Sequence, residues 1–163
     1  TELPGPDYDP EHVLPHNLWA SAESQEMAQV SPAAHEEFVM QYERRLLEPF
    51  GLNGYGCCED LTHKLDRVKT IRNMRRISIS PYADVEICAE QLGADYIFSW
   101  KPNPAYLVGD FDPNQIREYV RETLDATRGC VLEIILKDTH TCEGHPERFD
   151  AWTRIASDVV DAG

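Results

Sequence analysis

Thiol, imidazole and carboxylate side chains gather in two short segments of this 163-residue chain. The first is Cys57-Cys58-Glu59, and the second begins at His140 and includes Cys142. Thiolates and imidazoles are ligands that Zn²⁺ prefers, and a catalytic zinc site needs about three protein ligands and one open position. The two segments together predict a zinc site with Cys57, Cys58, His140 and Cys142 as its candidate ligands.

The same pattern leaves a second interpretation open. The chain contains no Cys-x-x-Cys pair, and the candidate ligands come from separate parts of the sequence. Unliganded thiols and exposed histidines would give the same pattern. The remaining cysteines, Cys88 and Cys130, fall within a predicted helix and at a predicted strand start, where small buried thiols are ordinary packing.

Alternating strand and helix patterns surround these segments. We expect strands at residues 17–20, 52–57, 76–80, 96–100 and 130–136, each followed by a helix. Ser31-Pro32, Asp84 and Asp112-Pro113 are typical helix starts, and Gly93 and Gly129 are typical helix ends. In the first helix, Phe38, Tyr42 and Leu46 recur at helical spacing, and we expect them to face the core.

Consecutive strand–helix units imply a parallel sheet, because parallel neighbours cannot be joined by tight turns. The fold class is therefore α/β, either an open doubly wound sheet or part of a (β/α)₈ TIM barrel. A full barrel takes about 250 residues, so this chain supplies about five consecutive βα units. We expect residues 1–16 to form an N-terminal arm or loop and residues 17–163 to form a TIM-barrel domain that lacks its N-terminal part.

In either architecture, the functional residues lie at the carboxyl ends of the strands. Glu23 follows the first predicted strand, and Tyr82 follows the third. Lys101 and Asn103 follow the fourth, and the segment with His140 and Cys142 follows the fifth. These residues and the Cys57 segment are the candidates for a shared site.

Composition narrows the function classes. Twenty-nine acidic residues against fifteen basic ones give a net charge of −14, which repels nucleic acids and anionic membranes. No stretch approaches the roughly 20 apolar residues of a membrane span. An odd number of cysteines and no Asn-x-Ser/Thr motif indicate a reducing, cytoplasmic compartment. A start at Thr1 indicates a trimmed or excised chain.

Several motifs, taken in order, resemble the C-terminal half of the uroporphyrinogen decarboxylase-like superfamily, nearest its methylcobamide:coenzyme M methyltransferase branch. They are the Ser31-Pro32 helix start, the segments at 54–59, 76–81 and 101–104, and the loop with Cys142 before the last helix. The resemblance covers about residues 17–160 and implies a TIM barrel. In the methyltransferase branch, a His-x-Cys pair and a later Cys hold zinc, and these fall on Tyr55, Cys57 and Cys142.

What the resemblance implies is methyl transfer between a corrinoid carrier protein and a small thiol acceptor. Zinc would be held by Cys57 and Cys142. Either Cys58, Glu59 or His140 takes the place of the family histidine, or the chain binds no metal. The implied catalytic and pocket residues are Glu59, Tyr82 and Asn103, and the implied cofactor-binding residues are Glu23 and Lys101.

Two alternatives remain. The chain could be a uroporphyrinogen decarboxylase-like enzyme without metal, which acts on a tetrapyrrole carboxylate. It could instead be a non-catalytic barrel fragment that assembles with a partner, because a five-unit piece exposes two parallel sheet edges. An N-terminal barrel half or self-association would then cover those edges.

Overall fold

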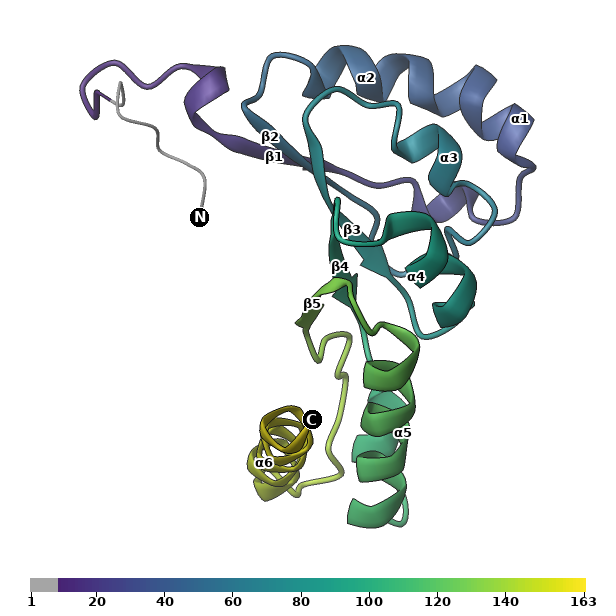
Figure 1. Cartoon of the computed structure of the whole chain (residues 1–163), viewed down its shortest axis with the longest axis vertical. Helices are drawn as coiled ribbons and strands as arrows, with labels where there is room; N and C mark the ends of the chain where they lie inside the picture. Colours follow the sequence, from purple (N-terminus) through teal and green to yellow (C-terminus); the bar gives the residue numbers. More distant parts are fainter. Residues whose placement is uncertain (1–8) are drawn as a thin grey trace.

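Five parallel strands lie side by side in chain order in the computed structural model, which describes residues 9–163. Neighbouring strands pair in the order β1-β2-β3-β4-β5, so each strand pairs with the strands next to it in the sequence (Figure 1). The strands are β1 (Trp19–Ala22), β2 (Leu52–Tyr55), β3 (Met74–Ile79), β4 (Ile97–Trp100) and β5 (Val131–Ile134).

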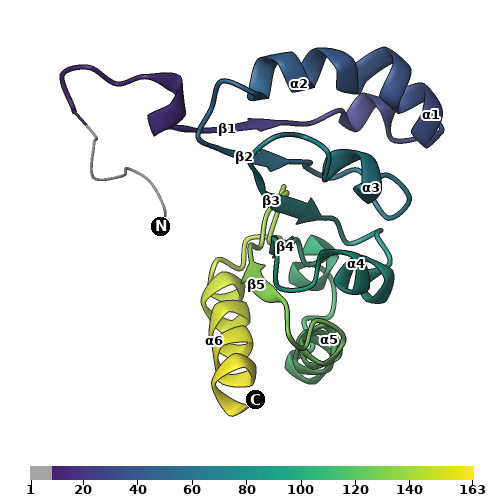
Figure 2. The ribbon, with the colours of Figure 1, turned by 45° about the horizontal axis from the view of Figure 1, so that its top comes forward.

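Helices α1 to α5 follow the strands and cover one side of the sheet, and α6 packs alongside α5 (Figures 1 and 2). A π-helical segment, η3, joins α1 to α2, and three 3₁₀ turns lie in loops. The helices are α1 (Pro32–His35), η3 (Glu36–Met40), α2 (Gln41–Leu47), α3 (Leu65–Val68), α4 (Val85–Leu92), α5 (Pro113–Ala126) and α6 (Glu147–Ala162). The 3₁₀ turns are η1 (Pro15–Asn17), η2 (Gln25–Met27) and η4 (Pro104–Leu107).

Side-chain caps set the helix starts where the sequence predicts them. The Asp84 carboxylate accepts a hydrogen bond from the Ile87 amide at 3.0 Å, and Asp112 accepts from the first amides of α5. The Ser31 hydroxyl accepts from the Ala34 amide at 3.2 Å. Each cap satisfies an amide that has no partner within the helix, which explains why these positions begin helices.

The two faces of the sheet differ in chemistry because side chains alternate along each strand. Ile77, Ile79, Phe98 and Trp100 are fully buried beneath the helices, and Trp100 lies against Tyr119 of α5 with the ring centroids 5.0 Å apart. The other face, turned away from α1–α5, carries polar side chains instead. This second face is called the polar face below, and its members include Arg76, Ser78, Ser99 and Glu133.

Two expectations about helices are wrong. The helix expected after the second strand is only the short α3, because residues 60–64 form turns around the Asp60 carboxylate and Leu61. The stripe Phe38, Tyr42 and Leu46 faces solvent, with 61–62% of each side chain exposed. Met40 and Leu47, on the opposite side of the same helix, are the residues that enter the core.

The fold is therefore α/β, with a five-stranded parallel sheet and alternating βα units, as the sequence predicts. This arrangement is compatible with part of a barrel. Residues 9–16 of the predicted arm run away from the sheet (Figure 1), and its residues 1–8 lie outside the described residues. Within residues 9–163, no helix is both long and apolar enough to cross a membrane.

Candidate functional site

Two adjacent thiols lie at the carboxyl edge of the sheet, directly after β2. The Sγ atoms of Cys57 and Cys58 are 3.6 Å apart, and both side chains are half-buried. The segment after β5 reaches the same place: Lys137 Nζ donates to Cys57 Sγ at 2.9 Å, and Cys58 Sγ donates to Asp138 Oδ2 at 2.7 Å. We call these four residues the thiol cluster.

The two thiols of the cluster have different electrostatic surroundings. Burial raises the pKa of Cys58 to about 12, and its hydrogen bonds to Asp138 and Cys57 add to this effect, so Cys58 is a protonated donor at neutral pH. Burial disfavours the charge on Lys137, but the hydrogen bond to Cys57 and the attraction of the neighbouring acidic groups outweigh it. The pKa of Lys137 therefore lies above its usual range, and its ammonium stays charged beside the Cys57 sulfur.

A second set of polar groups lies below the thiol cluster, on the polar face of the sheet. Lys101, only 4% exposed, donates to Ser99 Oγ at 2.5 Å, and Ser99 in turn donates to Glu133. Arg76 Nε donates to the same Glu133 carboxylate at 2.7 Å. Burial, together with the positive charges of Arg76 and Lys137, lowers the pKa of Lys101 to about 8. A buried lysine of this kind holds a labile proton near neutral pH.

Glu59 fixes the thiol-bearing loop to the loop after β1. Its carboxylate is 3% exposed, and it accepts hydrogen bonds from the Cys57 amide at 2.8 Å and the Ser24 amide at 3.2 Å. Both carboxylate oxygens are therefore engaged by backbone donors. This geometry makes Glu59 a positioning residue for Cys57.

Beneath this loop, four side chains from three segments form a buried hydrogen-bonded group. The Ser24 hydroxyl lies 2.6 Å from His35 Nε2 and 3.1 Å from the Tyr55 hydroxyl, which donates to Glu43 at 2.7 Å. His35 is fully buried. The position that the resemblance aligns with a family histidine, Tyr55, thus directs its hydroxyl into this group between β2 and the α1–α2 helix.

Because His35 is buried, the free energy of unfolding is expected to depend on pH in a way that can be measured. Burial, with the nearby positive charge of Lys64, lowers the pKa of His35 below its usual 6.5. The unfolded chain therefore binds a proton more readily than the folded chain, and stability falls as the pH drops through about 6.5. Burial raises the pKa of Glu43, which acts in the opposite sense at lower pH because folding then favours its protonated form.

Urea unfolding of the full chain between about pH 7.5 and pH 5.5 tests this. We expect the wild-type free energy of unfolding to fall over this range by up to about 1.4 kcal/mol per pH unit, the limit for one proton. The His35→Gln variant is expected to show a flatter profile, whatever its absolute stability. An equal slope in both proteins would contradict the assignment.

A cavity of about 560 Å³ adjoins the thiol cluster on the side of β1. The loops after β1, β2 and β3 surround it, and its lining includes Cys58, Glu59 and Tyr82. Tyr82 is 76% exposed, so its ring stands at the entrance. Lys64 closes the cavity floor and is itself held by the Met27 and Ala28 carbonyl oxygens, at 2.9 and 3.1 Å.

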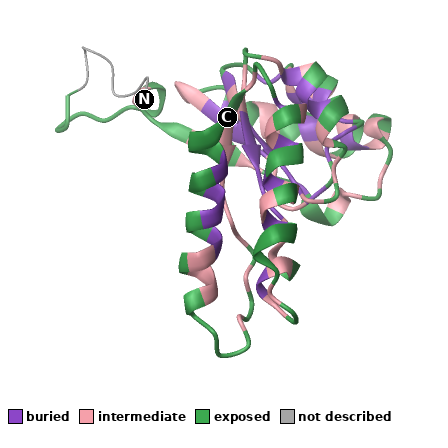
Figure 3. Cartoon of the chain, turned by 60° about the horizontal axis from the view of Figure 1, so that its bottom comes forward, coloured by how far each residue is buried: buried purple, intermediate pink, exposed green. Residues whose placement is uncertain are grey.

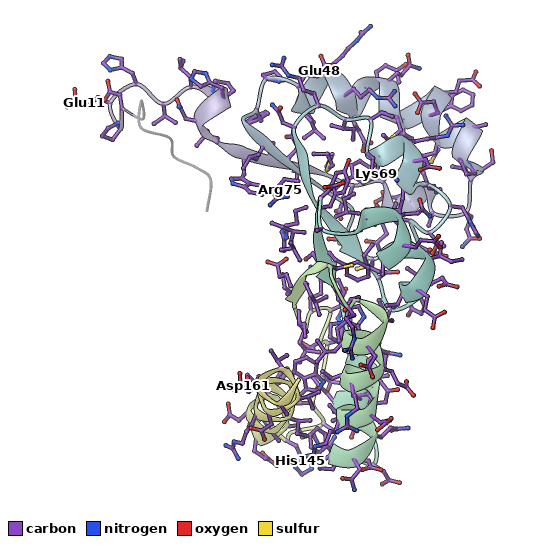
Figure 4. All side chains as sticks on the ribbon, viewed as in Figure 1. Glu11, Glu48, Lys69, Arg75, His145 and Asp161 are labelled. Carbon is purple, nitrogen blue, oxygen red and sulfur yellow. The ribbon has the colours of Figure 1, made fainter. Side chains whose placement is uncertain are left out.

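The other two candidate metal ligands are placed differently. His140 is exposed, and Cys142 lies beside Glu143, whose carboxylate accepts from the Gly109 amide at 2.8 Å. This loop runs toward the ends of α5 and α6 that are far from the sheet, where Figure 4 labels His145. Among residues 9–163, no group of three or more His, Cys, Asp and Glu side chains is arranged to hold a metal ion.

The remaining predicted residues lie at the expected edge with separate roles. Glu23 is exposed after β1. Asn103 caps η4, because its side-chain oxygen accepts from the Ala105 amide at 3.0 Å, and its own amide donates to Tyr119 at 3.2 Å. The structure therefore brings together Cys57, Cys58, Glu59 and Tyr82, with Lys101 behind the thiols.

Sequence reasoning missed the partners of these residues. Lys137 and Asp138 follow the most apolar strand of the chain, so their position at a strand end was a usable signal. Arg76, Ser99 and Glu133 are polar residues within strands, a pattern that is typical of a sheet face left uncovered by helices. Nothing in the sequence pattern points to the contact between Ser24 and His35, which depends on how three segments pack.

Comparison of the chain with protein-family models, with curated proteins and with solved structures gives no match.

Proposed function

We propose that this chain is the C-terminal part of a TIM-barrel enzyme of the uroporphyrinogen decarboxylase-like superfamily, which transfers a methyl group between a corrinoid carrier protein and a small thiol. The observation that carries the proposal is the pair of thiols 3.6 Å apart at the carboxyl edge of a parallel sheet. The strand order supports it, because barrel strands also pair in chain order. The cytoplasmic location expected from the cysteine content belongs to the same proposal.

The thiol pair suits zinc in its donor chemistry. Zn–S bonds are about 2.3 Å long, so two sulfurs on one tetrahedral ion lie about 3.8 Å apart, close to the separation of Cys57 and Cys58. These two residues would hold the ion. His140 and Cys142, the other ligands that the sequence predicts, lie on a loop anchored at Gly109, and that loop would have to move toward the thiols for either residue to bind the same ion. Bound zinc would supply a Lewis acid that favours the thiolate form of the acceptor.

The chain's own residues would prepare the site for the acceptor. Glu59 holds the Cys57 amide and so fixes the direction of the thiol-bearing loop. The cavity beside Cys58 would receive the acceptor, with Tyr82 at its entrance. The exposed Glu23 would face the corrinoid carrier, and the buried Lys101 would act on the bound group from behind the thiols. Asn103 would shape the loop after β4, where it caps η4.

Zinc analysis of metal-depleted, zinc-reloaded protein tests the proposal. We expect about one zinc per chain, and we expect the Cys57→Ser/Cys58→Ser double variant to lose it. Cys130→Ser is the matched control, because its thiol lies before β5 and bonds the Ala89 carbonyl oxygen, away from the cluster. Full zinc in the double variant would rule out the site, and loss of zinc in Cys142→Ser would add that thiol to the ligand set.

A second function, decarboxylation of a tetrapyrrole carboxylate without metal, is favoured by one specific observation. Arg76, Lys101 and Lys137 come from three neighbouring strands or strand ends and place positive charge near one another, in a chain whose net charge is −14. Such a cluster suits a carboxylate-rich substrate. Porphyrin carboxylate binding to the metal-depleted chain, weakened in the Lys101→Met variant, would favour this function over methyl transfer.

Completion of the barrel is the last part of the proposal. Strands β1 and β5 form the two edges of the described sheet, and the exposed stripe Phe38, Tyr42 and Leu46 lies on the helix nearest β1. Exposed strand edges and apolar stripes favour association. An N-terminal barrel half or a second copy of this chain is the proposed partner, and the molecular mass in solution distinguishes a monomer from either complex.

A further inference from the structure

We propose that Cys57 and Cys58 form a reversible disulfide with each other when a hydroperoxide oxidises Cys57. The inference concerns the same two thiols as the methyl-transfer proposal, but it does not require bound zinc. It follows from the contacts of the thiol cluster, in which each sulfur has a different charged partner. Adjacent thiols of this kind make the site a modification site whose substrate class is hydrogen peroxide or a small organic hydroperoxide.

The first argument is the division of roles between the sulfurs. The nucleophilic form of cysteine is the thiolate, and a lysine ammonium beside the sulfur stabilises that negative charge. Lys137 occupies this position for Cys57, at 2.9 Å. Cys58 instead donates its proton to Asp138 at 2.7 Å, so it is held as a thiol next to a base. Cys57 is therefore the attacking sulfur and Cys58 the resolving one.

The second argument is distance. The two sulfurs lie 3.6 Å apart, about van der Waals contact, so the second step requires only a short approach of one sulfur to the other. Both residues are half-buried at the edge of the sheet, which gives a small peroxide access to them. Cys142 belongs to a different loop, which is anchored at Gly109 because the Glu143 carboxylate accepts from the Gly109 amide at 2.8 Å.

The reaction balances in two steps. The Cys57 thiolate attacks one peroxide oxygen, the O–O bond breaks, and the alcohol or water leaves with a proton from solvent, so that Cys57 becomes a sulfenic acid. Cys58 then gives its proton to Asp138 and attacks the Cys57 sulfur. The S–O bond breaks, and hydroxide leaves as water with that proton. Two thiols are oxidised to one disulfide, and one peroxide is reduced.

The product is expected to be easily reduced. Neighbouring Cα atoms are about 3.8 Å apart across a trans peptide, which is shorter than the distance that unstrained disulfides span. A strained disulfide has a higher reduction potential and is opened readily by small thiols. Formation of this bond also removes both proposed zinc donors, so oxidation and metal binding exclude each other.

Mass spectrometry of the full-length chain tests the inference directly. Trypsin releases residues 46–64 as one peptide that contains Cys57 and Cys58 and no other cysteine. The protein is treated with a chelator, exposed to hydrogen peroxide and alkylated. We expect this peptide to lose two hydrogen atoms and to resist alkylation, and dithiothreitol is expected to restore both thiols.

Variants assign the roles. In Cys58→Ser, we expect Cys57 to stop at the sulfenic acid, which a dione probe labels, and in Cys57→Ser we expect no label on Cys58. Lys137→Met is expected to slow oxidation about tenfold, because the positive charge beside the sulfur is gone. Cys130→Ser is the matched control, because its thiol bonds the Ala89 carbonyl oxygen away from the thiol cluster, and it should form the disulfide at the wild-type rate.

Three results would overturn the inference: a disulfide between Cys58 and Cys142, direct conversion of Cys57 to the sulfonic acid, or no reaction at either thiol. The disulfide and zinc experiments can fail independently of each other. A chain that binds zinc but resists peroxide overturns only the disulfide. A chain that forms the disulfide but binds no zinc overturns only the zinc assignment.

Discussion

The Gly56→Ala variant is expected to lose about 2–5 kcal/mol of stability and to misplace Cys57. Gly56 has φ +88°, where a Cβ atom costs about 1–2 kcal/mol. The added Cβ would also lie 2.7 Å from Leu61 Cδ1 and 3.4 Å from Ser78 Cβ. Overpacking of this kind costs a further 1–3 kcal/mol, roughly.

Denaturant unfolding measures the stability loss, and the rate of thiol alkylation reports the position of Cys57. Gly129→Ala is the matched control: its φ of +92° is nearly the same, but no atom lies within 4 Å of the added Cβ. The control should lose only the stability that the positive φ costs, and its Cys57 should be alkylated at the wild-type rate. Equal losses in the two variants would show that the contact with Leu61 carries no energy.

The Glu59→Ala variant is expected to lose about 2–6 kcal/mol of stability and to release the thiol-bearing loop. Removal of this side chain leaves the Cys57 and Ser24 amides without their acceptor, and each unsatisfied buried donor costs about 1–3 kcal/mol. The positive charge of Lys64 would also lose its strongest attraction to a carboxylate, because Glu59 favours that charge more than Asp60 does.

Hydrogen exchange at the Cys57 and Ser24 amides checks this prediction separately from global stability. We expect both amides to exchange faster in Glu59→Ala and to be partly protected in Glu59→Gln, which retains one acceptor oxygen. Glu90→Ala is the control, because Glu90 is exposed on α4 and remote from the loop. Unchanged protection in Glu59→Ala would remove Glu59 from its positioning role.

Local signals predict the order of the elements because each signal acts within a few residues. Asp112-Pro113 specifies the start of α5 by a side-chain cap and a preset φ, and the structure confirms the cap and the position of the proline.

The orientation of the first helix on the sheet is harder to predict, because both sides of this helix carry apolar residues. Helical periodicity groups Phe38 with Tyr42 and Leu46, but it does not say that Met40 and Leu47 are the ones that meet the sheet. Figure 3 shows a similar division into a buried and an exposed side on α6, whose buried side carries Trp152, Ile155 and Val159.

The site could be predicted in its location but not in its contacts. Placement at strand ends identifies Cys57, Cys58 and Glu59 as neighbours of the loop after β5, and Lys137 and Asp138 in that loop do contact the thiols. The contacts themselves depend on the register of β4 and β5 and on the path of a loop. His140 and Cys142 follow Asp138 in the same loop, so the sequence places all three together. The loop turns toward Gly109 after Asp138, and this path could not be read from the sequence.

The pairing of every strand with its neighbours in the chain has a consequence for how this protein acquires its structure. Each new strand can dock on the one synthesised just before it, so every pairing spans a single βα unit, from Ile79↔Trp100 to Trp100↔Ile134. Closing a loop over one unit costs less entropy than closing it over several units, so a sheet paired in chain order forms more readily than a parallel sheet whose partners are further apart. Folding of this domain can therefore proceed from its N-terminal units while the segment that carries Lys137 is still being made, and the thiol cluster is among the last features to assemble.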